Sequence, residues 1–402
     1  MYKKLSLCLL LMACCLFASA QSYKKLHFNS IVVDTHNDIP STAIEKGVSF
    51  DQNLQTKTHS DLQRMLAGGV DAQFFSIWCD GNMQNPYAWA NREIDTVLAW
   101  TNRNPDKMMQ AFTAADIKKA VTQKKLAVLL GVEGGHMIEN DLNKLDALYN
   151  RGVRYMTITW NNSTNWATSA LDETAPSKSP TVGETWKDST RKKGLTDFGK
   201  QIIKRMNELG MLVDLSHVGE QTFWDAINTT TKPVLVSHSC VYSLCAHRRN
   251  LKDDQINAVG KNGGVIHLNF YSGFIDSSFD RRTDIFNNKH KAERDSLLKQ
   301  NPEPYFADVF LFEKYPEEVK ALRPPLSVLI DHLDYIVKLI GVDHVGIGSD
   351  FDGVNSLPQQ LDDITAMPLI TKELLARGYS KKDIRKILGE NFLRVFEANQ
   401  QQ

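Results

Sequence analysis

The chain has 402 residues, and its 47 Lys and Arg are matched by 47 Asp and Glu, so the formal net charge is zero. This balance gives no long-range attraction to polyanions, and we expect no nucleic-acid partner. Hydrophobic residues make up 42% and charged residues 23%, which is typical of globular proteins and excludes a disordered chain. The length alone is compatible with one large domain or with two to three smaller ones.

The N-terminus has the features of an export signal. Met1–Lys4 is basic, Leu5–Phe17 is apolar, and Ala18–Ala20 offers small residues for cleavage before Gln21. The apolar run is shorter than the roughly 20 residues that span a bilayer. We therefore predict a signal peptide over residues 1–20, a periplasmic or secreted protein, and no transmembrane segment in the mature chain. A lipoprotein signal, with lipid attached to Cys14, is the alternative.

Cysteine usage does not indicate a disulfide scaffold. Cys79, Cys240 and Cys245 remain after the predicted cleavage. An odd number predicts at least one free thiol per chain or a bridge between chains. A chain of this length can build a sufficient core without disulfides.

Short apolar runs rich in β-branched residues alternate with longer segments of helical character, a pattern typical of βαβ units and a parallel sheet. The eight predicted strands are Ile31–Asp34, Val70–Trp78, Ala127–Val132, Tyr155–Trp160, Leu212–Leu215, Val234–Ser237, Gly264–Asn269 and Val345–Gly348. Eight such units favour an α/β fold of the (β/α)8 TIM-like barrel class, formed as a single domain by residues 21–402. An open doubly wound sheet is the alternative that the strand count leaves open.

Two connections stand out along the chain. A helix is predicted from its N-cap Thr196 to Leu209, and Gly210 ends it just before the next strand. The seventh and eighth predicted strands are separated by more than 70 residues, with a polar and charged segment over 274–325. This segment is too long for a bare connection, so we expect an inserted lid or helical layer. A surface elaboration without a role is the alternative.

Side chains that bind metals follow several predicted strands, at the end where barrel enzymes place their sites. They are His36 and Asp38 after the first strand, Glu133 after the third, His217 after the fifth, His238 after the sixth and Asp350 after the eighth. Residues two apart on an extended chain point to the same side, as His36 and Asp38 would. Three imidazoles and two or three carboxylates are the donors that a pair of zinc-like ions needs. One carboxylate can bridge two metals about 3.5–4 Å apart.

Each of these residues also has a structural interpretation. A single His at a strand end more often forms a structural hydrogen bond than binds a metal, and Asp34 could brace its strand. We expect His136 to orient a metal ligand from behind rather than to bind metal. The remaining histidines without a strand-end position are expected to be structural: His59, His247, His332 and His344. The gathering of ligand-type residues at the same strand ends nevertheless favours a metal site.

The sequence blocks around these residues resemble a known family. The blocks are Asp34–Pro40, Gly131–His136, Asp214–His217, Ser237–Ser239, Tyr242–Asn250 and Gly346–Gly353. They are similar to the motifs of the membrane (renal) dipeptidases, metallopeptidases of the amidohydrolase-like barrel superfamily. The blocks span nearly the whole mature chain.

The resemblance implies a role for each matching residue and a cofactor of two zinc ions per chain. His36 and Asp38 would bind one zinc, His217 and His238 the other, and Glu133 both. Asp350 would be the general base. Arg249 would bind the C-terminal carboxylate of the substrate, a role that suits its two-pronged guanidinium.

The sequence departs from the family pattern at Trp160. The family usually has a His there, just after a Thr, which contacts substrate and helps to protonate the leaving amine. An indole cannot exchange a proton near neutral pH, so that role is empty or reassigned. Asp350 is the simplest replacement and His267 a weaker candidate. The disulfide pattern of the animal enzymes is also not expected, since Asn162 stands near the position of a Cys.

The first functional hypothesis is an exported dizinc dipeptidase that hydrolyses the peptide bond of small dipeptides, including those with a D-residue at the C-terminal side. The second keeps the two metals but acts on N-acyl amino acids or lactones, and Trp160 is the feature that favours it. The third is an inactive metal-binding or scaffold protein, against which the complete ligand set argues. The expected partner is a small dipeptide, and both a monomer and a homodimer are compatible with the sequence.

Overall fold

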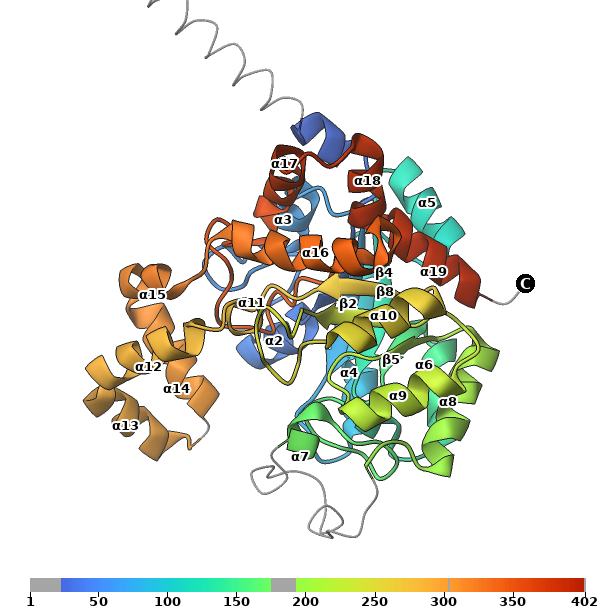
Figure 1. Ribbon diagram of the computed structural model, residues 1–402, viewed down its shortest axis with the longest axis horizontal. Helices are drawn as coiled ribbons and strands as arrows, with labels where there is room; N and C mark the ends of the chain where they lie inside the picture. The colour runs from blue at the N-terminus through green and yellow to red at the C-terminus, as the bar shows by residue number, and fades with distance from the viewer. Residues whose placement is uncertain (1–22, 175–192, 303, 401–402) are drawn as a thin grey trace, which may run out of the picture.

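The computed structural model describes residues 23–174, 193–302 and 304–400 (Figure 1). The predicted signal peptide and the alternative lipid site at Cys14 lie outside these ranges. Within them, no helix is both long and apolar enough to cross a membrane. Cys79, Cys240 and Cys245 are buried and unpaired, so the predicted free thiols are present and none of these sulfurs is available for a bridge between chains.

Parallel strands form one sheet in the described residues. They are β1 (Val33–Asn37), β2 (Ala72–Trp78), β3 (Met108–Gln110), β4 (Leu126–Glu133), β5 (Val153–Thr157), β6 (Leu212–Asp214), β7 (Leu235–Ser239), β8 (Val265–Leu268) and β9 (Val345–Ile347). Eight of them close into a ring, because β2 pairs with both β1 and β4, and β1 pairs with β9. This closed parallel barrel confirms the predicted TIM-like fold and excludes the open doubly wound sheet.

The strand β3 is the element that the sequence did not predict. Its three residues pair with Leu126, Ala127 and Val128 at the start of β4, whereas β5 pairs with β4 only from Leu130 onward. A run this short, with no β-branched residue, carries no strand signal of its own, and only the edge offered by β4 makes it a strand. The predicted strand ends also shift: β1 continues to Asn37, and β5 ends at Thr157 instead of Trp160.

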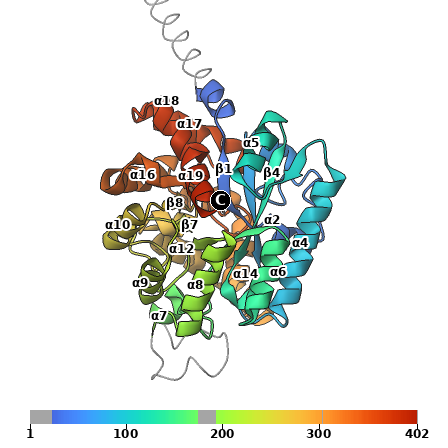
Figure 2. The same ribbon diagram turned by 90° about the vertical axis from the view of Figure 1, so that its right-hand side faces the viewer.

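Helices cover the outside of the ring, as the two perpendicular views show (Figures 1 and 2). They are α2 (Ile39–Lys46), α3 (Leu62–Ala67), α4 (Pro86–Arg103), α5 (Ala114–Thr122), α6 (Leu142–Asn150), α7 (Ala170–Thr174), α8 (Asp197–Leu209), α9 (Glu220–Thr229), α10 (Asp253–Asn262), α11 (Ser272–Ile275), α16 (Leu326–Ile340), α17 (Pro368–Ala376), α18 (Lys381–Arg385) and α19 (Asn391–Asn399). Short 3-10 or π turns are η1 (Gly135–Ile138), η3 (Val342–His344), η4 (Ile364–Ala366) and η5 (Lys386–Glu390). The predicted helix is α8, where the Thr196 side chain accepts from the amide of Gly199 and Gly210 adopts a left-handed conformation.

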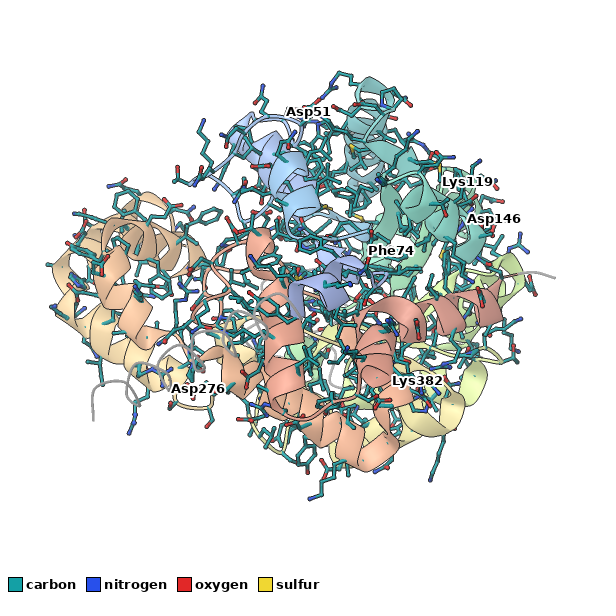
Figure 3. All side chains as sticks on the ribbon, turned by 90° about the horizontal axis from the view of Figure 1, so that it is seen from above. Asp51, Phe74, Lys119, Asp146, Asp276 and Lys382 are labelled. Atoms are coloured by element: carbon teal, nitrogen blue, oxygen red, sulfur yellow. The ribbon has the colours of Figure 1, made fainter. Side chains whose placement is uncertain are left out.

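Two apolar cores hold the barrel together. The larger one lies between the strands and the surrounding helices. The smaller one fills the barrel, where the ring of Phe74 packs against those of Tyr155 and of Phe392 in α19. In Figure 2, α19 lies across the middle of the ring, so it closes the end of the barrel where the strands begin. Figure 3 places Phe74 inside, whereas Asp51, Lys119, Asp146 and Lys382 lie around the outside.

The long connection between β8 and β9 contains a separate group of helices, here called the lobe. The lobe consists of α12 (Phe279–Lys289), α13 (Lys291–Gln300), α14 (Pro304–Lys314) and α15 (Pro316–Leu322). It has a small core of its own, with Phe279, Phe286, Leu311, Phe312 and Val319 buried. It projects from the side of the barrel opposite α19, which is the side where the strands end (Figures 1 and 2). These helices lie within residues 274–325, the segment for which a lid or helical layer was predicted.

Candidate metal centre

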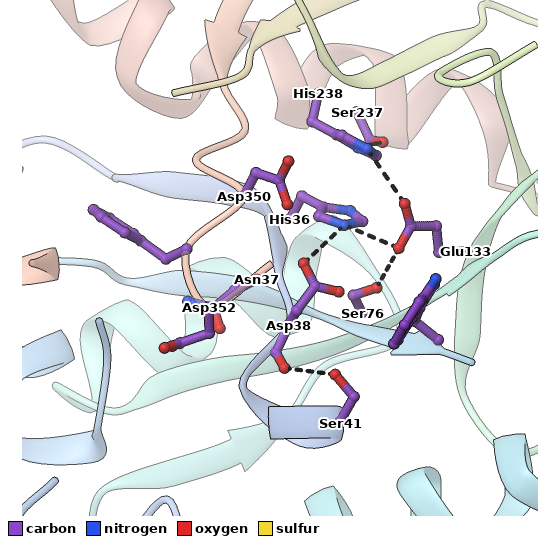
Figure 4. A network of polar contacts seen from close by, with 12 residues as sticks. His36, Asn37, Asp38, Ser41, Ser76, Glu133, Ser237, His238, Asp350 and Asp352 are labelled. Carbon is purple, nitrogen blue, oxygen red and sulfur yellow. Dashed lines mark hydrogen bonds and ion pairs between the residues drawn. The ribbon is translucent and has the colours of Figure 1, made fainter. Parts of the chain in front are cut away.

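Glu133 lies at the centre of a buried cluster of histidines and carboxylates at the C-terminal ends of the strands (Figure 4). It ends β4, and the strand register puts it level with Trp78 of β2 and Thr157 of β5. Oε1 lies 2.8 Å from Nε2 of His217 and 3.4 Å from Nε2 of His238, and Oε2 lies 3.4 Å from Nε2 of His36. Although burial disfavours the charge, the three histidines hold the pKa of Glu133 well below its usual range.

His36 connects this group to two further carboxylates. Its Nε2 lies 3.4 Å from Oδ2 of Asp38, the residue that follows β1. Ligand atoms of His36, Glu133 and His238 are close enough to hold one ion, and those of His36, Asp38 and Asp350 a second. All of these side chains are buried. The structure thus brings together the six residues that the sequence proposed as ligands or base. They lie in β1, β4 and β7 and in the segments that follow β1, β6 and β9.

Asp350 is held in place from two sides. Its amide donates to the carbonyl of His36, and its Oδ2 accepts from Nδ2 of Asn269, which follows β8. Gly353 packs closely against Asp350 and Asp38, and a Cβ on this residue would lie 2.2 Å from Oδ2 of Asp38. Burial raises the pKa of Asp350 well above its usual range, and the charges of Asp38 and Glu133 raise it further.

The backbone is strained at two residues of the cluster. His217 and Asp350 both adopt left-handed conformations, with φ of 65° and 61°. Such conformations cost residues other than glycine of the order of 1 kcal/mol or more, and they concentrate at functional sites. Here they turn both side chains into the mouth of the barrel just after β6 and β9 end.

Three hydrogen bonds orient the histidine rings, and each joins Nδ1 to a protein oxygen. Nδ1 of His36 lies 2.9 Å from the hydroxyl of Tyr155, that of His217 3.1 Å from Oδ1 of Asn161, and that of His238 2.7 Å from Oγ of Ser237. Nε2 of each ring therefore faces Glu133. No sequence motif indicated Tyr155, Asn161 or Asn269, because each lies on a different strand or loop from the residue it contacts.

The donors at this centre call for cations. Nε2 of His217 and Nε2 of His238 lie 3.0 Å apart, and both lie beside a carboxylate oxygen. Burial lowers the pKa of His217 to about 3 and that of His238 well below its usual range, so both rings are neutral. Nε2 of His36 and Oδ1 of Asp38 are buried without a hydrogen-bond partner. Imidazole nitrogens and carboxylate oxygens gathered this closely are the donors that divalent metals bind, so the residues fit such ions.

Arg249 is a buried cation beside the cluster. Its Nη2 donates to the carbonyl of His238 and its Nη1 lies 3.3 Å from Oγ of Ser239, while Nε has no partner. Burial lowers the pKa of the guanidinium to about 10, so it remains charged at neutral pH. Among the described residues no carboxylate forms an ion pair with it. A buried, charged guanidinium without an ion-pair partner favours an anionic ligand.

Trp160 forms part of the wall of the mouth. Its ring lies 5.1 Å from that of Trp78 in an edge-to-face arrangement and 6.4 Å from the imidazole of His217. The side chain is partly exposed. The residue therefore places an apolar surface next to the histidine side of the cluster.

The remaining histidines are held by hydrogen bonds away from the metal cluster. In the described part of the chain His136 hydrogen-bonds Cys79 rather than a residue of the cluster: its Nε2 lies 3.2 Å from the carbonyl of Cys79. The expectation that it orients a ligand is therefore wrong, because η1 turns the ring away toward β2. His267 is fully buried, and its Nδ1 bonds the carbonyl of Ile347, which is a structural role. The four histidines expected to be structural, His59, His247, His332 and His344, each hydrogen-bond a backbone group.

The sequence was compared with models of known families. Residues 20–402 match the model described as membrane dipeptidase (peptidase family M19). The chain belongs to this family. Its members are metallo-dipeptidases, hydrolases that act on peptide bonds, and the family resemblance found in the motifs is confirmed.

Solved structures share the fold of the chain. The probable dipeptidase PvdM from Pseudomonas aeruginosa is 22% identical, with a TM-score of 0.76, over 95% of this chain and 98% of that one. A metallopeptidase from Rhodobacter sphaeroides, liganded with a phosphinate mimic of L-Ala-D-Ala, is 22% identical, with a TM-score of 0.72, over 92% and 100%. An amidohydrolase from Pseudomonas aeruginosa is 21% identical, with a TM-score of 0.69, over 94% and 98%. These likenesses extend over the whole barrel.

Proposed function

We propose that this member of the membrane dipeptidase family is an exported dizinc enzyme that hydrolyses small dipeptides, including those with a D-residue at the C-terminal side. The observation that carries the metal requirement is the pair of neutral imidazole nitrogens 3.0 Å apart beside Glu133. Export is supported by the signal-like pattern of residues 1–20. The D-residue is supported by the relative that binds a mimic of L-Ala-D-Ala.

The metal ligands divide into two groups around Glu133. His36 and Asp38 would hold one zinc, His217 and His238 the other, and Glu133 would contribute one oxygen to each. Nitrogen and carboxylate donors without thiolates are typical of catalytic rather than structural zinc sites. When bound, the two ions would polarise the scissile carbonyl and lower the pKa of the attacking water.

Asp350 would move the proton. Asn269 occupies its Oδ2, which leaves Oδ1 for a water in the mouth. One carboxylate at this place could accept a proton from the water and later return it to the departing amine. Trp160 has no exchangeable proton for this step, and His267 lies too deep in the barrel to reach the amine.

Arg249 would bind the carboxylate of the substrate. The guanidinium is buried, charged and without an ion pair among the described residues, so a substrate carboxylate would supply its missing partner. This contact would fix the distance between the free C-terminus and the scissile bond. It would therefore restrict hydrolysis to short substrates.

The lobe would act as a lid over the mouth. A groove with a volume of about 610 Å³ separates Glu313 of α14 from the segment around Lys46 and Lys57. Tyr305, near the start of α14, has an exposed aromatic side chain. Tyr305 would then contact the part of the substrate that projects from the mouth.

Hydrolysis of N-acyl amino acids or lactones is the second candidate. Trp160 favours it, because an apolar wall beside the metals would accommodate an acyl chain where a dipeptide presents its amino group. Dipeptides and N-acyl amino acids would share the metals and Arg249, and they differ in the group on the Trp160 side of the scissile bond.

The test combines metal analysis with substrate panels. The mature protein is purified from an exporting host, its N-terminus is determined, and its zinc content is measured. Hydrolysis is then followed for L,L- and L,D-dipeptides, N-acyl amino acids and lactones. We expect an N-terminus at Gln21, two zincs per chain, and kcat/KM highest for dipeptides. Fewer than one zinc per chain would favour a scaffold protein, and a preference for acyl substrates would favour the second candidate.

A further inference from the structure

The three histidines of the metal centre differ in what supports their Nδ1 atoms. The amide oxygen of Asn161 can only accept, so Nδ1 of His217 carries the proton. Oγ of Ser237 gives its own proton to Asp214, 2.7 Å away, and therefore accepts from His238. In both rings the proton on Nδ1 leaves the lone pair on Nε2, which faces Glu133.

His36 is supported by a phenol instead. Its Nδ1 lies 2.9 Å from the hydroxyl of Tyr155, a residue on the opposite side of the ring of strands. The hydroxyl has no other hydrogen bond in the described part of the chain. His36 would hold one of the two zincs together with Asp38 and Glu133, so the orientation of this ring affects that metal position.

The barrel interior is shaped to hold the Tyr155 ring in this place. Gly131 of β4 is paired with Tyr155 of β5, and a Cβ at Gly131 would lie 2.0 Å from the ring. The ring of Phe74 packs against it at 5.0 Å. Both Tyr155 and His36 are fully buried. The glycine is thus required for the ring to cross the barrel, which explains a small residue in the middle of an otherwise bulky strand.

We propose that Tyr155 is a positioning residue for the metal centre: its hydroxyl accepts the Nδ1 proton of His36 and so directs the Nε2 lone pair at the ions. This inference rests on the proposed function, since it needs metal at His36. Tyr155, a residue of the barrel core, would thereby contribute to the affinity for metal. Support of this kind typically contributes about 10- to 100-fold in affinity.

The test compares Tyr155→Phe with Tyr379→Phe. The first removes the hydroxyl and keeps the aromatic ring between Gly131 and Phe74. The second removes a hydroxyl that donates to Asp334 on the outer helices. Zinc affinity is measured by competition with a chelator, and thermal midpoints are measured with and without zinc. We expect Tyr155→Phe to bind zinc at least tenfold more weakly, with a metal-free midpoint close to that of the parent, and Tyr379→Phe to bind zinc normally.

The outcomes separate this inference from the proposed function. A parent protein that binds no zinc would overturn the proposed function itself. A parent that binds zinc and a Tyr155→Phe variant with the same zinc affinity would overturn only the role of Tyr155.

A second measurement is made on the unaltered protein, and a variant serves only to assign its signals. Nitrogen-15 spectra of the zinc-loaded protein report which ring nitrogen of each histidine carries a proton, and His36→Asn identifies the signals of His36. We expect the proton on Nδ1. An unprotonated Nδ1 would mean that Tyr155 donates, and it would overturn the proposal.

Discussion

The mouth of the barrel and the lobe are built in opposite ways. At the mouth, polar side chains are buried and fixed by hydrogen bonds from several strands, as for Asp350 between His36 and Asn269. In the lobe, α13 buries no residue, and three aromatic side chains of α14 remain about half exposed: Tyr305, Phe306 and Phe310.

The forces that hold the two regions differ accordingly. Many contacts within the lobe are ion pairs at its surface, such as Lys289 with Glu318, which contribute about 0–1 kcal/mol each. The mouth instead depends on buried hydrogen bonds and close packing. A rigid mouth suits ion binding and proton transfer, whereas a loosely supported lobe suits the selection of substrates. Variants of the mouth should therefore change metal content or chemistry, and variants of the lobe should change selectivity alone.

The largest effect is expected for Glu133→Gln. Loss of the charge at the centre should remove at least one zinc per chain and lower kcat by several orders of magnitude. Metal analysis and steady-state kinetics measure both. Glu139→Gln is the matched control, because Glu139 lies in the same segment but pairs with Lys144. Full zinc content and activity in Glu133→Gln would show that the mouth is not organised around this residue.

Arg249→Ala should mainly raise KM. Loss of a buried charge-assisted contact costs about 2–5 kcal/mol, so KM should rise strongly for substrates with a free C-terminal carboxylate. The corresponding C-terminal amides lack that charge and should be affected much less. Arg248→Ala is the control, since Arg248 is adjacent to Arg249 in the chain but its side chain is exposed. Equal losses for acids and amides would remove Arg249 from carboxylate binding.

Trp160→His should keep both zincs and change the preferred substrate. The variant replaces an apolar wall by a polar ring that can transfer a proton. The kcat/KM for dipeptides should therefore rise relative to that for N-acyl amino acids. Ratios of kcat/KM on the two panels measure the change. Loss of zinc in this variant would instead mean that Trp160 holds the ligands in place.

Tyr305→Ala tests the lobe. We expect a change of less than about tenfold in kcat/KM, or 1.4 kcal/mol, that differs between substrates, with zinc content unaltered. Ile285→Ala is the control on the exposed surface of α12. An equal effect on all substrates, or a loss of zinc, would show that the lobe supports the mouth rather than selecting its ligands.

The smallest catalytic effect is expected for His267→Asn. The side chain is buried and bonds the carbonyl of Ile347, and burial lowers its pKa to about 4, so the ring is neutral and remote from proton transfer. The variant should lose about 1–3 kcal/mol of stability and keep kcat within about tenfold of the parent. Denaturant unfolding and kinetics measure the two. A thousandfold fall in kcat, with metals and fold intact, would identify His267 as the catalytic acid.

The amino-acid sequence by itself determined the barrel class and the candidate ligands. Alternation of β-branched runs with helical segments is a local pattern, and the carboxyl ends of parallel strands must meet at one edge. The positions of His36, Glu133 and His238 at such ends therefore predicted that they would lie together, as the structure shows.

Only the tertiary structure decided what lies around those ligands. The short strand β3 exists because β4 offers it an edge, and Tyr155 reaches His36 because Gly131 leaves space between two strands. The ring of His136 is turned toward Cys79 by η1, although its motif suggested a role beside the ligands. These contacts join residues far apart in the chain, and a sequence pattern carries no information on which side chains meet across a barrel until the strands are in register.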